Sequence, residues 1–287
     1  MATTTQLAPL PAVERLSPAC IRILGGNPGK FTLQGTNTYL VGTGRRRILI
    51  DTGEGRLAWI DSLKSTLQEE GATVETALVS HWHPDHMGGI DDLLRIAPGA
   101  TVYKNDPEPG QSAIRDGQTF HAEGVTLTAS HTPGHTADHV VFVMEEEDAM
   151  FTADNVLGHG TAVFEDMGAY LGSLDKMLGL FSGRAYPGHG PVVEDGPGKI
   201  AEYRAHRRQR EEQVLRTMGG PGSGGAETTT TWTAMDVVKV VYRDVPEELH
   251  AAACGGVLQM LDKLEREGRV ARDGDDGWQL ARDQSTL

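Results

Sequence analysis

The sequence predicts an α/β protein with two β-sheets, helices outside them, and a small module at the C-terminal end. Three observations lead to this fold class. Short apolar runs alternate with segments whose apolar residues recur at helical spacing. Polar, histidine-rich motifs follow several of the apolar runs, and a glycine-rich stretch at residues 219–225 sets the last part of the chain apart. A chain of 287 residues has room for one large domain and a small one.

The order of the predicted elements places strands in both halves of the large domain. Apolar and β-branched runs predict strands at residues 21–24, 38–41, 47–50, 76–79, 125–128, 140–143 and 150–153. Helical spacing predicts helices at residues 57–70, 90–94, 171–181 and 200–218, the first ended by Gly71 and the third by Gly183. Two strand-rich halves with helices outside predict a layered sandwich.

The last part of the chain has the pattern of a winged-helix-like module. Its expected elements are a helix that starts with a capping box at Thr233 and Asp236, a helix through Leu258, Leu261 and Leu264 that stops at Gly268, and a hairpin over 269–280 that turns at Asp276 and Gly277. We therefore predict a large domain at 1–218, a flexible linker at 219–230 and a winged-helix-like domain at 231–287.

The most informative stretch is His81-Trp82-His83-Pro84-Asp85-His86, which directly follows a predicted strand and Ser80. Imidazole and carboxylate groups are common zinc ligands. In an extended loop, His81 and His83 point the same way and can bind one ion, while Asp85 and His86 lie where the chain turns into a helix and can face a second ion. Three of the chain's eleven histidines within six residues favour a metal site over a solvated polar loop.

Three further polar residues lie where a strand is expected to give way to a loop. His135 follows a Pro-Gly turn, Asp154 ends an apolar run, and His189 lies between two glycines that let the backbone pass close to an ion. Loops held by a rigid scaffold are where binding and catalytic sites are usually built. Each residue alone is a weak signal, but together they predict a site with two metal ions.

This series of motifs resembles the metallo-β-lactamase superfamily, and His86 directly after Asp85 resembles its dinuclear hydrolase branch. The resemblance implies a four-layer αβ/βα sandwich. It implies that His81, His83 and His135 hold one metal ion, that Asp85, His86 and His189 hold the other, and that Asp154 bridges the two. It also implies that Asp51 acts beneath the site and orients a ligand histidine.

A narrower resemblance covers nearly the whole chain. The segments 27–29, 32–40 and 163–166 are similar to the β-lactamase-like protein 2 group, which includes an endoribonuclease and fungal thioesterases that release aromatic polyketides from carrier proteins. The segments 16–18 and 21–25 and Phe31 are closer to the thioesterases. The resemblance therefore implies a secondary-metabolism enzyme that acts on the acyl carrier protein domain of a polyketide synthase.

The expected chemistry is hydrolysis by a hydroxide that two metal ions activate, with Asp85 and Asp154 as catalytic residues. Five histidines and two aspartates suit Zn²⁺, although Mn²⁺ or Fe²⁺ would accept the same ligands. A thioester suits this site because its thiolate, with a pKa of about 8.5, leaves with little help from an acid. The alternative is a single-strand-specific endoribonuclease, and a third hypothesis is a binding protein with a structural metal site.

Charge and composition weigh on these alternatives. The net charge of −14 disfavours nucleic acid, which usually binds to a basic surface. Residues 227–279 hold eleven acidic and six basic residues, so we expect the winged-helix-like domain to pack against the core or a partner rather than read DNA. No run approaches the roughly 20 apolar residues of a membrane span. Residues 1–20 show no secretory or mitochondrial signal pattern, so we expect a cytoplasmic protein whose Cys20 and Cys254 are reduced.

Several residues near the motifs have two interpretations. We expect Trp82 to pack beneath its loop, His159 to be solvated, and Glu165 and Asp166 either to support the metal ligands or to cap a helix that begins near Tyr170. The loops 27–34 and 157–166 are expected to flank the site. The basic residues of the helix at 200–218 could steer an acidic partner, but we favour a solvated helix face; they are Arg204, Arg207, Arg208 and Arg210, with Glu202, Glu211 and Glu212 as partners.

Overall fold

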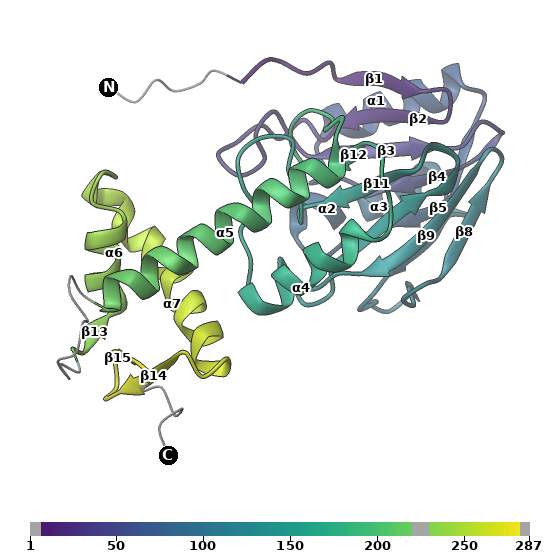
Figure 1. The fold of residues 1–287 in the computed structure, drawn as a ribbon. Coiled ribbons are helices and arrows are strands. Elements are labelled where there is room, and N and C mark those ends of the chain that lie inside the picture. Colours follow the sequence, from purple (N-terminus) through teal and green to yellow (C-terminus); the bar gives the residue numbers. More distant parts are fainter. Residues whose placement is uncertain (1–6, 220–229, 282–287) are drawn as a thin grey trace. The chain divides into compact units, whose positions relative to one another are not determined.

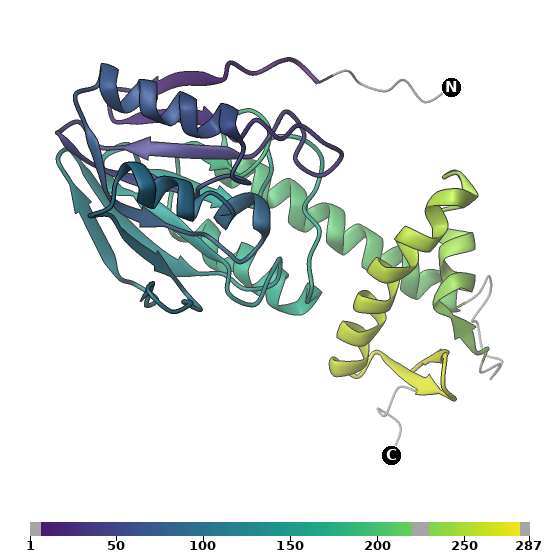
Figure 2. The same cartoon turned by 180° about the vertical axis from the view of Figure 1, so that it is seen from behind.

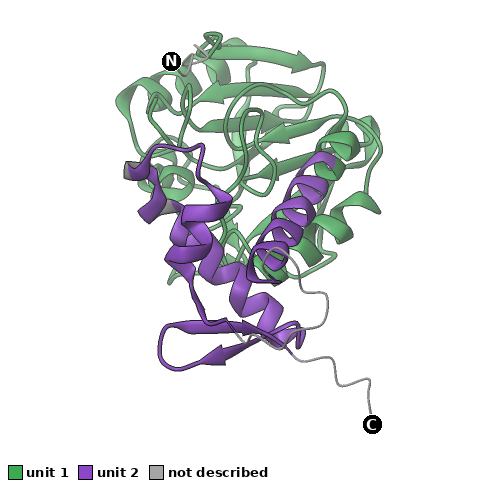
Figure 3. Cartoon of the chain, turned by 60° about the vertical axis from the view of Figure 1, so that its left-hand side comes forward, with its two compact units in different colours: residues 1–201 green, residues 202–287 purple. Residues whose placement is uncertain are grey.

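The computed structural model describes residues 7–219 and 230–281 (Figure 1). The chain divides into two compact units, residues 1–201 and 202–287, drawn in different colours in Figure 3. The predicted linker at 219–230 lies outside the described residues except for its two ends, and the domain boundaries predicted at 218 and 231 stay a prediction. Both cysteines are free, as expected.

The first sheet of unit 1 has seven strands in sequential order, antiparallel from β1 to β4 and parallel from β4 to β7. The strands are β1 (Val13–Ser17), β2 (Cys20–Leu24), β3 (Asn37–Val41), β4 (Arg46–Ile50), β5 (Thr73–Leu78), β6 (Thr101–Lys104) and β7 (Ser112–Ala113). The sequence pattern missed β1, β6 and β7, because they are short or carry few apolar residues. The other four strands confirm the prediction.

The second sheet has five strands in the order β12-β11-β10-β9-β8, of which only the β11–β12 pair is parallel. Its strands are β8 (Thr119–Ala122), β9 (Val125–His131), β10 (Val140–Met144), β11 (Ala149–Ala153) and β12 (Ala185–Pro187), with a short 3₁₀ turn η1 (Glu145–Glu147) between β10 and β11. Residues from both sheets, including Tyr39, Phe142 and Phe151, form one buried cluster, so the two sheets pack face to face.

Helices cover the outer face of each sheet (Figures 1 and 2). The helices α1 (Leu57–Glu69), α2 (Pro84–Met87) and α3 (Ile90–Ile96) belong to the first half, and α4 (Met167–Leu178) to the second. Trp59 and Leu63 of α1 pack with Ile23 and Leu49 of the first sheet in a second buried cluster. The resulting order of helix, sheet, sheet and helix confirms the predicted four-layer sandwich.

The helix α4 begins and ends earlier than predicted. The sequence pattern placed it at residues 171–181, whereas it spans Met167–Leu178 and its C-cap is Gly179 rather than Gly183. The reason is local, because the carboxylate of Asp166 accepts a hydrogen bond from the Ala169 backbone amide at 2.9 Å. Such an N-cap satisfies a donor of the first turn, so Asp166 takes the capping role of its two proposed roles.

Unit 2 contains most of α5 (Gly196–Gly219) and the predicted helices and hairpin. It adds α6 (Ala234–Val241), η2 (Glu247–Leu249), α7 (His250–Arg266) and a three-stranded sheet of β13 (Trp232–Thr233), β15 (Gly277–Leu280) and β14 (Val270–Asp273). The capping box of α6 is present as predicted. The hairpin turn is one correction, since Gly277 pairs with Asp273 inside the ladder and the turn lies at 274–276, where Gly274 has a φ of 74°.

Two basic residues of α5, Arg210 and Arg216, have partners within unit 2. The guanidinium of Arg210 lies over the ring of Tyr242, 4.3 Å from its centroid, and Arg216 pairs with Glu212 at 2.9 Å. Glu211 contacts Lys263 at 2.7 Å and also Arg269. Glu211 therefore links α5 to Lys263 of α7 and to Arg269, and the solvated helix face stays a prediction. No helix among the described residues is long and apolar enough to cross a membrane.

Candidate metal centre

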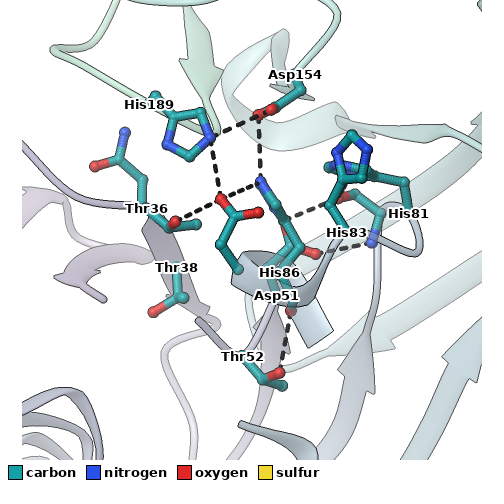
Figure 4. Close-up of polar contacts among 12 residues, drawn as sticks. Thr36, Thr38, Asp51, Thr52, His81, His83, His86, Asp154 and His189 are labelled. Carbon is teal, nitrogen blue, oxygen red and sulfur yellow. Dashed lines mark hydrogen bonds and ion pairs between the residues drawn. The ribbon is translucent and has the colours of Figure 1, made fainter. Parts of the chain in front are cut away.

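The seven predicted ligands meet at one edge of the two sheets in unit 1. Figure 4 shows His81, His83, His86, Asp154 and His189 among them. The motif at residues 81–86 follows β5 and runs into α2, His135 lies in the loop between β9 and β10, and Asp154 and His189 follow β11 and β12. The structure therefore brings together residues that lie up to about a hundred positions apart in the chain. Their side chains form two groups. Within each group, the potential ligand atoms all lie within 4.8 Å of one another.

The first group consists of His81, His83, His135 and Asp154. The Nδ1 atom of His83 lies 3.0 Å from the Nε2 atom of His81 and 3.0 Å from the Nε2 atom of His135. These three ring nitrogens converge from two loops, and a cation between them could accept a lone pair from each. This donor set fits a divalent metal ion.

The second group consists of Asp85, His86 and His189. The Nε2 atom of His189 lies 3.3 Å from the Asp85 carboxylate, and the Nε2 atom of His86 lies 3.4 Å from the same oxygen. His86 is fully buried, yet its Nε2 atom makes no hydrogen bond within the described part of the chain. A buried polar atom without a partner is costly, and a metal ion would remove that cost.

Asp154 lies between the two groups. Its Oδ1 atom is 3.3 Å from His86 Nε2, and its Oδ2 atom is 3.2 Å from His189 Nε2 and 3.6 Å from His135 Nε2. The backbone leaves room for it only because residue 188 is a glycine, where a Cβ atom would lie 2.3 Å from Asp154 Oδ1. The position of Asp154 supports the bridging role that the resemblance implied, and its role as a ligand stays a prediction.

A buried hydrogen-bond network beneath the site fixes which ring nitrogens face it. Asp51 accepts hydrogen bonds from the Ser80 amide at 2.8 Å and from the Ser80 hydroxyl at 2.9 Å, and its Oδ2 atom lies 2.7 Å from His86 Nδ1. The Ser80 oxygen in turn lies 2.9 Å from His81 Nδ1. With both Nδ1–H groups engaged below, the Nε2 atoms of His81 and His86 face the site. Asp51 therefore lies where the resemblance expected it.

Two further contacts orient ligands from the sides. His135 Nδ1 donates to the backbone carbonyl of Val163 at 2.8 Å, and the Thr36 hydroxyl donates to Asp85 Oδ2 at 2.9 Å. The loop that carries His135 is itself held by a buried ion pair, in which Lys104 Nζ lies 2.7 Å from Asp138 Oδ2. Because these partners come from distant elements, they limit the motion of each ligand side chain.

One histidine at the site, His139, was not among the predicted site residues. His139 is fully buried, and its Nε2 atom lies 3.3 Å from the Asp154 backbone nitrogen while its Nδ1 atom lies 3.2 Å from the Thr132 hydroxyl. Its ring lies 5.2 Å from that of His81. It therefore supports Asp154 from behind. Its place directly before the apolar run at 140–143 was the only available signal, and such a position is also typical of a core histidine.

The proton affinities of the two groups differ. Burial and the neighbouring His86 hold the pKa of His81 well below its usual range, and burial and His135 lower the pKa of His83. Burial also opposes a charge on His86 and His189, but Asp154 outweighs it, so the pKa of His86 rises well above its usual range and that of His189 rises to about 9.

The carboxylates of the site stay ionised. Burial opposes ionisation of Asp85 and Asp154, but the histidines prevail: a hydrogen bond from His189 lowers the pKa of Asp85 to about 2, and the charges of His189 and His86 hold the pKa of Asp154 well below its usual range. Both carboxylates are therefore available to a cation at any pH near neutrality.

A cavity of about 320 Å³ opens above the two groups. Its floor includes five of the predicted ligands, and the loops 30–33 and 157–163 form its walls, as the sequence analysis expected for these loops. His159 lines this cavity and is exposed, in keeping with the expected solvated loop histidine. The cavity is of the size that accepts drug-sized ligands.

Trp82 does not pack beneath its loop, which corrects the expectation. Its side chain is 46% exposed, and its ring centroid lies 4.5 Å from that of His83. The physical reason is the alternation of an extended segment, in which His81 and His83 point into the site and the residue between them points out. Glu165 is exposed, and neither it nor Asp166 lines the cavity.

Family models match both parts of the chain. Residues 31–109 and 97–189 match the metallo-beta-lactamase superfamily, and residues 233–278 match the beta-lactamase associated winged helix domain. The chain belongs to the metallo-beta-lactamase superfamily, and the predicted winged-helix character of its C-terminal part is confirmed. With its His and Asp groups able to hold divalent metal ions, it is a hydrolase of this superfamily.

Similar proteins come from fungi. The atrochrysone carboxyl ACP thioesterase of Aspergillus chevalieri is 47% identical over 270 residues, which cover 93% of this chain and 87% of that protein. The lactamase-like protein adaB of Aspergillus niger is 45% identical over 273 residues, which cover 93% of this chain and 86% of that protein. A beta-lactamase domain protein from Burkholderia ambifaria shares the fold, with a TM-score of 0.77, 20% identity and coverage of 98% and 96% of the two chains.

Proposed function

We propose that this protein is a thioesterase that releases an aromatic polyketide from the acyl carrier protein domain of a polyketide synthase. The observation that carries the proposal is the pair of converging ligand groups beneath an open cavity. Relatives of nearly the same length that are named ACP thioesterases add support. Seven ligands around two ions leave positions open for water and substrate, which a purely structural metal site does not need.

We assign His81, His83 and His135 to one metal ion, Asp85, His86 and His189 to the other, and Asp154 to both. Zn²⁺ suits this set of nitrogen and oxygen ligands, and Mn²⁺ or Fe²⁺ is the alternative. When bound, two such ions activate water as a nucleophile at neutral pH and polarise the carbonyl of the substrate. The ionised Asp154 lies close to histidines of both groups, where it would contact either ion, and the Thr36 hydroxyl holds the orientation of Asp85.

The surroundings of the site suit a thioester better than a phosphodiester. A thiolate leaving group, with a pKa of about 8.5, departs without a strong general acid, and the cavity walls present none that is buried and poised near the ligands. A single-stranded RNA would need a basic track, whereas the chain carries a net charge of −14. The endoribonuclease alternative is therefore not favoured. We also propose a cytoplasmic location, as the sequence predicts.

The test compares the metal-loaded protein with an Asp154→Ala variant. We expect hydrolysis of an aromatic acyl thioester to fall by about a hundred- to a thousandfold, the effect typical of losing one well-placed electrostatic group at an active site. Asp61→Ala is the matched control, because it makes the same change at an exposed position of α1. Metal content, measured by atomic absorption, should fall in the first variant only.

The same preparations are given a labelled single-stranded RNA. Thioester cleavage that depends on Asp154, with the RNA intact, supports the proposal. RNA cleavage with the thioester intact would overturn it and favour the nuclease. Two bound metal ions without either activity would mean that the substrate class is wrong.

A further inference from the structure

One wall of the cavity is a loop whose shape is held by its own hydrogen bonds. Gly29 and Leu33 pair across it, the Thr32 hydroxyl donates to the Asn27 carbonyl at 2.6 Å, and Leu33 adopts a φ of 54° that is rare for a bulky residue. A backbone outlier of this kind persists only where its surroundings hold it, and it is often found at ligand sites. The loop is therefore a built feature of the cavity.

The tip of this loop presents an aromatic side chain that the rest of the described chain leaves uncovered. Phe31 lines the cavity and is 71% exposed, with the Lys30 ammonium 5.5 Å from its ring centroid. Exposing a phenyl ring to water costs free energy that burial against a ligand would recover. An exposed aromatic ring on a firmly held loop is thus a candidate contact for an apolar ligand.

The other wall presents a second exposed apolar residue. Val163 lines the cavity and is 60% exposed, and Leu157 and Ala162 line the same side. Apolar groups therefore lie on both walls of the cavity, beside Lys30 and Thr32 on one and His159 and Thr161 on the other, while the carboxylates and the ligand histidines form the floor. This lining favours a ligand that is apolar along much of its sides and carries its reacting polar group at the end that reaches the floor.

Each wall is also joined to a proposed metal ligand. The base of the first loop reaches Asp85 through the Thr36 hydroxyl, and the Val163 carbonyl accepts the hydrogen bond of His135. Thr36 is itself tied to the loop, because its amide donates to the Asn27 side chain at 2.9 Å. A flat group held between the walls would therefore have a defined position relative to both ligand groups.

We propose that Phe31 and Val163 form a clamp for the aromatic acyl part of the substrate, with Phe31 as the residue that selects aromatic over aliphatic acyl groups. This inference rests on the proposed thioesterase function. Aromatic rings prefer offset-stacked or edge-to-face contacts, which a flat acyl group can make with Phe31 and a flexible chain cannot. The Val163 side chain supplies shape but no such preference.

The test uses the full-length, metal-loaded protein with naphthoyl and octanoyl thioesters of N-acetylcysteamine. For Phe31→Ala we expect the KM for the naphthoyl thioester to rise about tenfold and that for the octanoyl thioester by about threefold or less, with kcat within about twofold for both. Phe31→Leu, which keeps an apolar side chain, should still lose selectivity. Leu57→Ala is the matched control, because this residue is 80% exposed on α1 and does not line the cavity.

A second measurement does not depend on turnover. Calorimetry of naphthoate binding to the same variants should show about tenfold weaker binding for Phe31→Ala and no change for Leu57→Ala. Equal losses for the two thioesters, or an unchanged KM together with unchanged naphthoate binding, would overturn the clamp. If the unsubstituted protein hydrolyses neither thioester but its naphthoate binding depends on Phe31, the thioesterase function fails and the clamp stands.

Discussion

The two proposed ligand groups use the same residue types but differ in how strongly they hold protons. His81 and His83 of the first group have lowered pKa values, mainly because of burial, whereas His86 and His189 of the second group have raised ones. The difference follows from where the carboxylates lie. His86 alone has Asp51 on one side and both Asp85 and Asp154 on the other.

This difference shows that burial alone does not decide the charge of a histidine. All of these rings except that of His83 are buried, and burial lowers the pKa of each of them. Neighbouring carboxylates reverse the outcome only in the second group. In the metal-free protein at pH 7, His81 and His83 are therefore neutral and ready for a cation, while His86 and His189 must release protons before they can bind one.

Removing the charge of Asp51 should cause the largest difference in metal affinity between the two groups. We expect Asp51→Asn to weaken metal binding at the second group by about 10- to 100-fold, the usual cost of losing a partner that orients a ligand. Asparagine is the suitable replacement, because Asp51 has a φ of 59° and Asn tolerates this region of backbone space. Metal titration followed by atomic absorption measures the change.

Ser80→Ala is the companion variant, because it removes the hydroxyl next to His81 and its hydrogen bond to Asp51 Oδ2 but leaves the Ser80 amide bonded to Asp51. It should weaken metal binding at the first group more than at the second. If the two variants weakened metal binding at both groups equally, the two groups would not be oriented by different hydrogen bonds of this network.

The dependence of metal binding on pH should also separate the groups. Because the pKa of His189 is raised to about 9, lowering the pH through 9 adds a proton that competes with the metal, and affinity at the second group should fall about tenfold per pH unit for each proton displaced. His81 and His83 of the first group should add no such dependence near neutral pH, because their pKa values are lowered. Calorimetry in buffers of different ionisation enthalpy counts the released protons, and a count of zero at pH 7 would contradict this prediction.

The smallest effect is expected from Thr36→Val, which keeps the shape of the side chain but removes its hydrogen bond to Asp85. Metal binding at the second group should weaken about three- to tenfold, the usual net contribution of one hydrogen bond. Thr38→Val is the control, because the Thr38 hydroxyl bonds to Ile23 and Trp59 and touches no proposed ligand. If Thr38→Val lost as much metal affinity as Thr36→Val, the loss would come from a less stable β3 rather than from the hydrogen bond to Asp85.

Much of the site was predictable because its ligands carry local signatures. His81, His83, Asp85 and His86 lie within six residues directly after a strand, and His135, Asp154 and His189 each follow another strand. Since strand ends of a packed sandwich meet at its edge, their convergence could be expected, although their role as ligands stays a prediction. The outward position of Trp82 was not predicted, although it follows from the alternation of side chains in an extended segment. The early start of α4 was not predicted either, because the hydrogen bond of the Asp166 cap decides where the helix begins, rather than the spacing of its apolar residues.

The sequence by itself determined the class of fold, the seven candidate ligands and the winged-helix character of the C-terminal part, because apolar periodicity, strand-end histidines and a capping box act over a few residues. Only the tertiary structure decided which nitrogens face the site, which histidines hold protons and what lines the cavity. These properties come from pairs far apart in the chain, such as Asp51 with His86, Thr36 with Asp85 and Val163 with His135. A pattern of residues that are close in sequence cannot predict such pairs, because the pairs form only when the two sheets pack together.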